Sequence, residues 1–209
     1  FLFFLAGLQA IPHSLVEAAA RGVFPSWTEA RPGRREHMAR VAALLEEWAR
    51  GRGEPPAERT RWVAAGYLHD ALRDADPGGL RLAVDPAFRD LPGKVLHGPG
   101  VARRLREEGV ADEELLHALA YHTLGSEDFG PLGWALYSAD FLDPGRSLRE
   151  AWRAGLRGRA SQDLEGVVRE ILQARIRYQA ERGRPIHPRT VAFWNRLAEG
   201  EDWASASEV

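Results

Sequence analysis

The feature that most constrains the fold of this chain is a histidine–aspartate pair inside an apolar segment. The segment Trp62-Val-Ala-Ala-Gly-Tyr-Leu-His-Asp-Ala-Leu72 places His69 and Asp70 where a buried helix would carry apolar residues. Burying a carboxylate is unfavourable by several kcal/mol unless another group pairs with it. A divalent cation is a natural partner, because imidazole and carboxylate are both metal ligands. We therefore look for further ligands that the fold can bring to this pair.

Apolar residues recur along the chain at helical spacing. His37, Val41, Leu44, Leu45 and Trp48 stand at i, i+4, i+7, i+8 and i+11, which is one stripe of a helix. An alternating pattern typical of a strand never extends beyond about four residues. The sequence therefore predicts an all-α fold. The other helices are expected from Pro55 to about Leu72 and over residues 101–108, 113–122 (capped by Asp112), 132–141, a short one capped by Ser147, 164–178 and 191–197. A loop rich in proline and glycine is expected over residues 76–100.

Composition limits the classes of function. The chain has 209 residues, of which 44% are apolar, so it can bury the core of one domain. A net charge of −2 and a pI near 6.4 argue against general binding to nucleic acid or to membrane surfaces. Cysteine is absent, so disulfides and thiolate metal sites are excluded and a cytoplasmic protein is favoured. Any metal must be held by histidine and carboxylate.

We expect the folded domain to span residues 27–198, with an apolar leader over 1–26 and a tail over 199–209. The run from Phe1 to Ile11 is too short to span a bilayer, which needs about 20 residues. It also lacks the basic flank of a signal peptide. Residues 4–19 separately resemble the cytoplasmic coupling loop of ABC-type sugar transporter permeases, in Phe4-Leu-Ala-Gly-Leu-Gln-Ala-Ile-Pro12 and Leu15-Val-Glu-Ala-Ala19. A terminal helix docked on the domain would account for the same residues.

Other histidines and one aspartate stand at positions from which they could reach the pair. Adjacent helical residues lie about 100° apart around the axis, so His69 and Asp70 can both contact one ion, and the second Asp70 oxygen stays free for another. Ligands from other segments could then complete two coordination spheres. These ligands are His37 and Asp140 for the first sphere, and His97 and His122 for the second. We interpret Gly98-Pro-Gly100 as a turn that presents His97, and we expect His13, His117 and His187 at the surface or in ordinary packing.

The order His … His-Asp … His … His … Asp resembles the HD-domain phosphohydrolases. Five pieces in order are similar to the YqeK-type branch, the symmetrical diadenosine tetraphosphate (Ap4A) hydrolases. They are Arg34-Arg-Glu-His37, Ala64-Ala-Gly-Tyr-Leu-His-Asp70, Leu96-His-Gly-Pro99, Ala118-Leu-Ala-Tyr-His-Thr-Leu-Gly125 and Tyr137-Ser-Ala-Asp-Phe-Leu-Asp-Pro-Gly-Arg146. The resemblance implies an HD-domain helical bundle with the metal site between helices. It also implies a nucleotide polyphosphate substrate, no nucleic-acid or membrane partner, and a homodimer as an open possibility.

The resemblance also implies roles for residues. Two divalent transition-metal ions are expected, with iron first and manganese, cobalt, nickel or zinc as alternatives. A metal-bound hydroxide would attack a bridging phosphate and release two ADP. The first ion would be held by His37, His69, Asp70 and Asp140, and the second by Asp70, His97 and His122. Asp70 and Arg73 would be catalytic, and the substrate would contact Lys94, Thr123, Gly125 and Arg146.

The chain departs from the branch at two positions. Arg73 replaces the usual lysine three residues after the dyad aspartate, and Asp143 replaces the usual glutamate before the proline of the last motif. Arginine keeps the charge but is a planar fork rather than a point charge. These changes bear on substrate contacts more than on metal binding.

Other functions are compatible with the same residues. One is an HD phosphohydrolase acting on other nucleotides, on (p)ppGpp or on a cyclic dinucleotide, although the Gly-Tyr-Pro element of the cyclic-dinucleotide forms is absent. Another is a non-catalytic regulatory domain that binds metal. A third, a fragment of a membrane transporter, depends only on residues 4–19.

Overall fold

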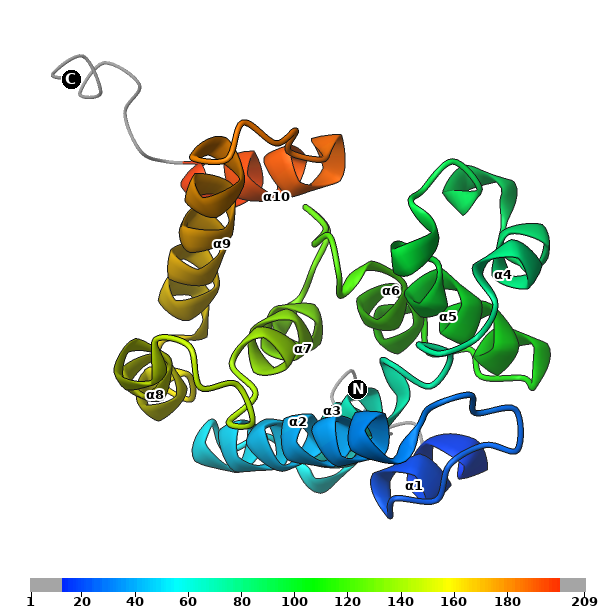
Figure 1. Ribbon diagram of the computed structural model, residues 1–209. Helices are drawn as coiled ribbons and strands as arrows, with labels where there is room; N and C mark the ends of the chain where they lie inside the picture. Colours follow the sequence, from blue (N-terminus) through cyan, green and yellow to red (C-terminus); the bar gives the residue numbers. More distant parts are fainter. Residues whose placement is uncertain (1–12, 200–209) are drawn as a thin grey trace, which may run out of the picture.

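The structure is a computed structural model that describes residues 13–199, and regular secondary structure in that range is helical throughout (Figure 1). The all-α prediction is confirmed. The α-helices are α1 (Ser14–Ala20), α2 (Pro32–Gly51), α3 (Pro56–Leu68), α4 (Pro77–Ala83), α5 (His97–Glu107), α6 (Glu113–Tyr121), α7 (Pro131–Phe141), α8 (Glu150–Arg159), α9 (Leu164–Ala180) and α10 (Pro188–Ala198). Two short 3-10 helices, Pro86–Phe88 and Gly93–Val95, lie between α4 and α5.

Local sequence signals explain where several helices begin. Proline at the first position of α2 and α3 has no N–H to leave unsatisfied and already has a helical φ. The carboxylate of Asp112 accepts a hydrogen bond from the Leu115 N–H at 3.0 Å, as the sequence predicts for the cap of α6. Asp163 caps α9 in the same way through the N–H of Gly166.

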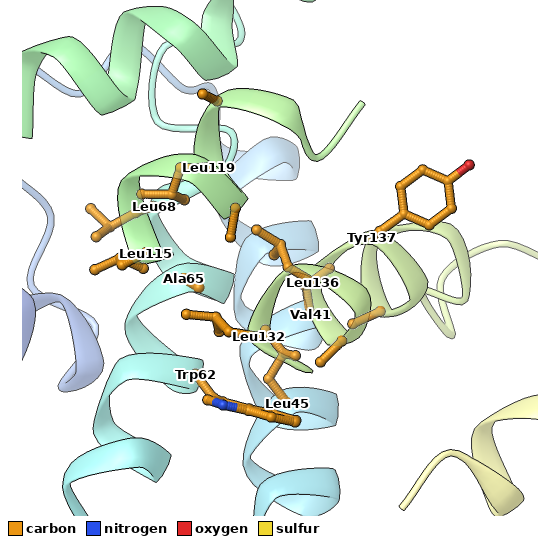
Figure 2. Packing of buried hydrophobic residues seen from close by; sticks show 14 of the residues in the cluster. Val41, Leu45, Trp62, Ala65, Leu68, Leu115, Leu119, Leu132, Leu136 and Tyr137 are labelled. Carbon is orange, nitrogen blue, oxygen red and sulfur yellow. The ribbon is translucent and has the colours of Figure 1, made fainter. Parts of the chain in front are cut away.

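The core lies where α2, α3, α6 and α7 meet. Figure 1 shows α7 in the middle of the molecule, with α2 and α3 on one side of it. Figure 2 shows side chains of the four helices converging, and all of those labelled are buried. They are Val41 and Leu45 of α2, Trp62, Ala65 and Leu68 of α3, Leu115 and Leu119 of α6, and Leu132 and Leu136 of α7. Tyr137 of α7 points away from them and packs on Phe193 of α10. Burying each large apolar side chain stabilises the fold by about 1.5–3 kcal/mol.

Helices α2 and α3 approach each other closely at one glycine. A Cβ added at Gly66 would lie 2.5 Å from the Cα of Ala42 and 2.6 Å from its backbone nitrogen. Only glycine leaves room for this crossing. The crossing matters for function because α2 carries His37 and α3 ends next to His69.

Several predicted boundaries are wrong. Helix α3 ends at Leu68, not near Leu72, so the dyad lies at the end of the helix and in the turn that follows it. Helix α5 begins at His97, so Gly98-Pro-Gly100 is its first turn rather than a separate turn. Proline is tolerated there because the first turn needs no N–H donor. Gly98 allows the helix to approach α6, since a Cβ would lie 2.6 Å from the carbonyl oxygen of Leu119.

Two more local predictions fail. The predicted loop over residues 76–100 contains α4, which Asp76 caps by accepting from the Gly79 N–H at 2.7 Å. Ser147 does not cap α8. That helix begins at Glu150, directly after Arg149, whose φ of 57° is left-handed. The proline- and glycine-rich composition of these segments does not indicate short helices, because such helices depend on tertiary contacts for their stability.

The predicted leader over residues 1–26 contains α1, which packs on α3 with Val16 and Ala19 buried. The boundary at residue 27 stays a prediction. Residues 4–12 of the permease-like stretch lie outside the described residues, as does most of the predicted tail. Within residues 13–199, we find no helix that is long and apolar enough to cross a membrane.

Candidate metal centre

The dyad occupies the buried end of α3. His69 is the last residue with a helical hydrogen bond, from its N–H to the carbonyl of Ala65 at 3.0 Å, and its side chain is fully buried. Asp70 lies in the following turn and is 4% exposed. The sequence analysis expects both side chains on one helix. In the structure one lies at the helix end and the other in the turn, and both face the same buried space.

Three further histidines come to this space from other helices. His37 comes from the second turn of α2, His97 from the first residue of α5, and His122 from the end of α6. All three are at most 5% exposed. In each of these three imidazoles and in that of His69, the Nδ1 atom faces an oxygen at 2.7–3.0 Å, so Nδ1 carries the proton of the neutral ring. The Nε2 atoms therefore present lone pairs to the centre.

These Nε2 atoms meet in pairs around the carboxylate of Asp70. The Nε2 atoms of His37 and His69 are 3.3 Å apart, and those of His97 and His122 are 3.1 Å apart. The Oδ2 atom of Asp70 lies 3.8 and 3.6 Å from the first pair. Its Oδ1 atom lies 3.0 and 3.7 Å from the second pair. The two oxygens of one carboxylate thus divide four imidazoles into two sets.

The charges of the centre favour cations. Burial opposes ionisation of Asp70, but the imidazoles of His69, His122 and His97 hold its pKa well below the usual value. Burial lowers the pKa of His69 to about 4 and also lowers that of His97. Burial also opposes protonation of His37 and His122. Hydrogen bonds nevertheless raise both pKa values, through Asp140 for His37 and through Asp70 for His122. The carboxylates of Asp140 and Asp70 therefore stabilise positive charge on His37 and His122.

The donor set fits metal ions. Ligand atoms of His37, His69 and Asp70 all lie within 4.8 Å of one another, and so do those of Asp70, His97 and His122. Imidazole nitrogen with carboxylate oxygen suits first-row divalent ions. Two facing lone pairs at 3.1–3.3 Å repel unless a proton or a cation lies between them. The second set matches the predicted second sphere, and the first matches the predicted first sphere without Asp140.

Asp140 lies beside the first set. Its Oδ1 atom is 3.2 Å from Nε2 of His37 and 3.0 Å from a guanidinium nitrogen of Arg146. Burial opposes ionisation, yet the hydrogen bond to His37 holds the pKa of Asp140 far below its usual value. Asp140 is therefore an anion next to the first set, and its role as a ligand stays a prediction.

Only some of the residues predicted to act on the substrate make side-chain contacts with the centre. Arg146 points to the centre through Asp140, and the Thr123 hydroxyl lies 3.3 Å from Nε2 of His122. The side chains of Arg73 and Lys94 have no hydrogen bond or ion pair with any residue in the described part, and Arg73 acts on His97 by its charge. Gly125 is buried with φ of +84°, and a Cβ there would lie 2.2 Å from Phe193. Packing explains this glycine, and its contact with substrate stays a prediction.

Sequence reasoning missed three side chains that contact the site residues. Arg34 donates to Oδ2 of Asp70 at 2.7 Å. Asp143 accepts from Nδ1 of His37 at 2.7 Å and from Nε of Arg40 at 2.6 Å. Arg34 and Arg40 stand three residues before and after His37, so helical spacing places both on its face of α2. That spacing is the signal that would have identified them.

A cavity of about 590 Å³ opens at the first set. Its lining includes His37 and Asp143 together with Arg31, Arg34 and Arg146. Arginine guanidinium groups bind phosphate oxygens in a bidentate manner. His37, a member of the first set, therefore lines the cavity beside three arginines suited to phosphate.

The remaining histidines have local structural roles. His13 and His187 accept hydrogen bonds from backbone N–H groups that begin α1 and α10, each at 3.2 Å. His117 lies 2.9 Å from the hydroxyl of Ser126. They take no part in the two sets, as the sequence analysis predicts.

Comparison with known proteins gives one family. The sequence model of the HD domain family matches residues 34–171. A protein of Halalkalibacterium halodurans named symmetrical bis(5'-nucleosyl)-tetraphosphatase is 32% identical over 147 residues, which cover 68% of this chain and 78% of that protein. A protein of Bacillus subtilis with the same name is 26% identical over 171 residues, 81% of each chain.

A solved structure shows the same fold. It is the crystal structure of a predicted HD superfamily hydrolase involved in NAD metabolism from Clostridium acetobutylicum. The TM-score is 0.68 at 20% identity, and the match covers 89% of this chain and 96% of that one. The chain belongs to the HD domain family and is related within it to curated symmetrical bis(5'-nucleosyl)-tetraphosphatases.

Proposed function

We propose that this chain is a metal-dependent hydrolase that cleaves diadenosine tetraphosphate in the middle of its phosphate bridge and releases two ADP. The observation that carries the proposal is the division of four buried imidazoles into two sets by the two oxygens of Asp70. Paired ions are suited to displacement at phosphorus. The names of the relatives support the choice of substrate.

The metal would be held by residues that the fold already orients. His37, His69 and Asp70 would bind one ion, with Asp140 beside them, and Asp70, His97 and His122 would bind the other. Iron is our first expectation, with manganese, cobalt, nickel or zinc as alternatives. A divalent ion at such a site lowers the pKa of a coordinated water to about 7 and neutralises phosphate oxygens.

The residues of the chain perform the remaining tasks. Asp70 keeps both oxygens available to the two sets because the surrounding imidazoles hold it ionised. Arg34 and Arg146 contact Asp70 and Asp140 from the cavity side, and each has further N–H donors for phosphate. Both guanidinium groups can thus hold the polyphosphate over the centre. Burial of the imidazoles keeps bulk water away from their Nε2 atoms.

The test is a product analysis. Purified protein is incubated with diadenosine tetraphosphate and iron(II) or manganese(II), and the nucleotides are separated by chromatography. We expect ADP as the sole product. Release of AMP with ATP would show asymmetric cleavage and refute the proposal, as would faster hydrolysis of a deoxynucleoside triphosphate or of ppGpp. The His117→Asn variant is a matched control, because it removes an imidazole outside both sets.

A further inference from the structure

His37 differs from the other imidazoles of the centre in how its Nδ1 atom is held. His69, His97 and His122 each face a carbonyl oxygen three residues earlier, on Gly66, Lys94 and Leu119, at 2.8, 3.0 and 2.8 Å. His37 instead faces Oδ2 of Asp143 at 2.7 Å, 106 residues away in the sequence. The ring of His37 is thus oriented by a distant segment and the other rings by their own.

The position of each histidine in its helix explains the difference. His69 and His122 follow the last residues of α3 and α6, and His97 follows closely on the 3-10 helix Gly93–Val95. The last carbonyl groups of a helix have no helical N–H partner and can accept from a side chain. His37 lies inside α2, where the preceding carbonyls accept helical hydrogen bonds. A ring at that position needs an acceptor from another part of the chain.

Asp143 is itself held rigidly. Its Oδ1 atom accepts from Nε of Arg40 at 2.6 Å and from the N–H of Gly145 at 2.9 Å. Its Oδ2 atom accepts from His37 and from a second nitrogen of Arg40 at 3.0 Å. The carboxylate is 3% exposed. Because Arg40 and His37 both come from α2, the fork of Arg40 fixes Asp143 relative to the ring that it orients.

We propose that Asp143, held by Arg40, is a positioning residue for one half of the metal centre, the set of His37, His69 and Asp70. Its hydrogen bond keeps the proton of His37 on Nδ1 and aims Nε2 at Asp70 and Asp140. Among the described residues, no hydrogen bond or ion pair joins Asp143 to Asp70, His97 or His122, so we expect their set to bind metal without it. The inference rests on the proposed metal centre, and it does not depend on the substrate.

The experiment is a titration of metal-free protein with manganese(II), followed calorimetrically, without substrate. In Asp143→Asn we expect the affinity of one site to fall 10- to 100-fold, the range found when an outer partner of a ligand is removed, and the affinity of the other site to stay unchanged. His37→Ala and His97→Ala identify which site is which. Nitrogen-15 NMR of the His37 ring should show loss of the single Nδ1–H tautomer in Asp143→Asn.

Asp163→Asn is the matched control. Asp163 also accepts a backbone hydrogen bond, from Gly166 at 2.9 Å, but it lies at the start of α9 away from the centre. Because asparagine also caps helices, this variant should keep both affinities and nearly all of its stability. Wild-type affinities at both sites in Asp143→Asn, or equal falls at both, would overturn the proposal. If Asp143→Asn does not fold, Arg40→Gln should weaken the same single site, and unchanged binding there would overturn it.

The role proposed for Asp143 and the proposed reaction can be refuted independently of each other. A protein that binds manganese as described but does not release ADP would refute the proposed reaction and leave the role of Asp143 intact. Symmetric cleavage with unaltered metal binding in Asp143→Asn would do the reverse.

Discussion

The crossing of α2 and α3 at Gly66 offers a sharp test of how the fold assembles the centre. Changing Gly66 to alanine adds a Cβ at 2.5 Å from the Cα of Ala42, whereas ordinary contacts begin at 3.4 Å. The obstacle is backbone, so the helices must separate by about 1 Å. The same shift would move His37 relative to His69, whose Nε2 atoms are now 3.3 Å apart.

The magnitude follows from two opposing effects. Overpacking against a rigid neighbour destabilises by about 2–3 kcal/mol. Alanine inside a helix is favoured over glycine by about 1 kcal/mol. We therefore expect Gly66→Ala to lower the free energy of unfolding by about 1–2 kcal/mol. Gly155→Ala in α8 is the control, because a Cβ there meets nothing within 4 Å. It should raise the free energy of unfolding by about 0.5–1 kcal/mol.

The assay is urea unfolding of both variants and the wild type, followed by circular dichroism in a chelating buffer. A manganese titration of the same proteins, after removal of the chelator, should show weaker binding only in Gly66→Ala. If Gly66→Ala is as stable as Gly155→Ala and binds metal like the wild type, the close crossing does not set the geometry of the centre.

Three further predictions concern other positions. Gly125→Ala should destabilise by about 2–4 kcal/mol in urea unfolding, because it combines left-handed strain with a clash on Phe193; wild-type stability would contradict this. Burial lowers the pKa of His117 below 6.5, so its contribution to stability is present above pH 6.5 and is lost as the pH falls, when the unfolded chain takes up the proton. Unfolding of metal-free protein from pH 8 to 5.5 should show a smaller fall for His117→Asn than for the wild type, and parallel curves would contradict the assignment. Arg146→Gln should raise KM for diadenosine tetraphosphate about 10-fold or more. Its stability should stay nearly unchanged, because the Arg146 side chain that pairs with Asp140 is 43% exposed. An unchanged KM would exclude Arg146 from substrate binding.

Several ligand candidates could be identified from the sequence because they are ionisable residues at positions where helical periodicity calls for apolar ones. His37 on the stripe of α2 and Asp140 in the apolar α7 are the clearest cases. Periodicity also located the long helices α2 and α9. These features depend on local sequence, so local reasoning found them.

The partners that orient the ligands depend on tertiary contacts. Nothing near His37 in the sequence indicates that Asp143 accepts its Nδ1 proton. Helical continuation beyond Leu68 is equally compatible with the residues up to Leu72, and only the packed fold ends the helix at the dyad. Gly98-Pro-Gly100 has the composition of a turn, and its helical conformation follows from packing of α5 on α6.

If Asp70 joins the two metal sets, neither set binds its ion without this residue, and the metal content of the protein shows this dependence. Wild-type protein and Asp70→Ala are loaded with iron(II) or manganese(II) under identical conditions, freed of excess metal and analysed for ions per chain. We expect two ions per chain in the wild type and none in Asp70→Ala, because both sets lose a shared ligand. Full metal content in Asp70→Ala would contradict this expectation.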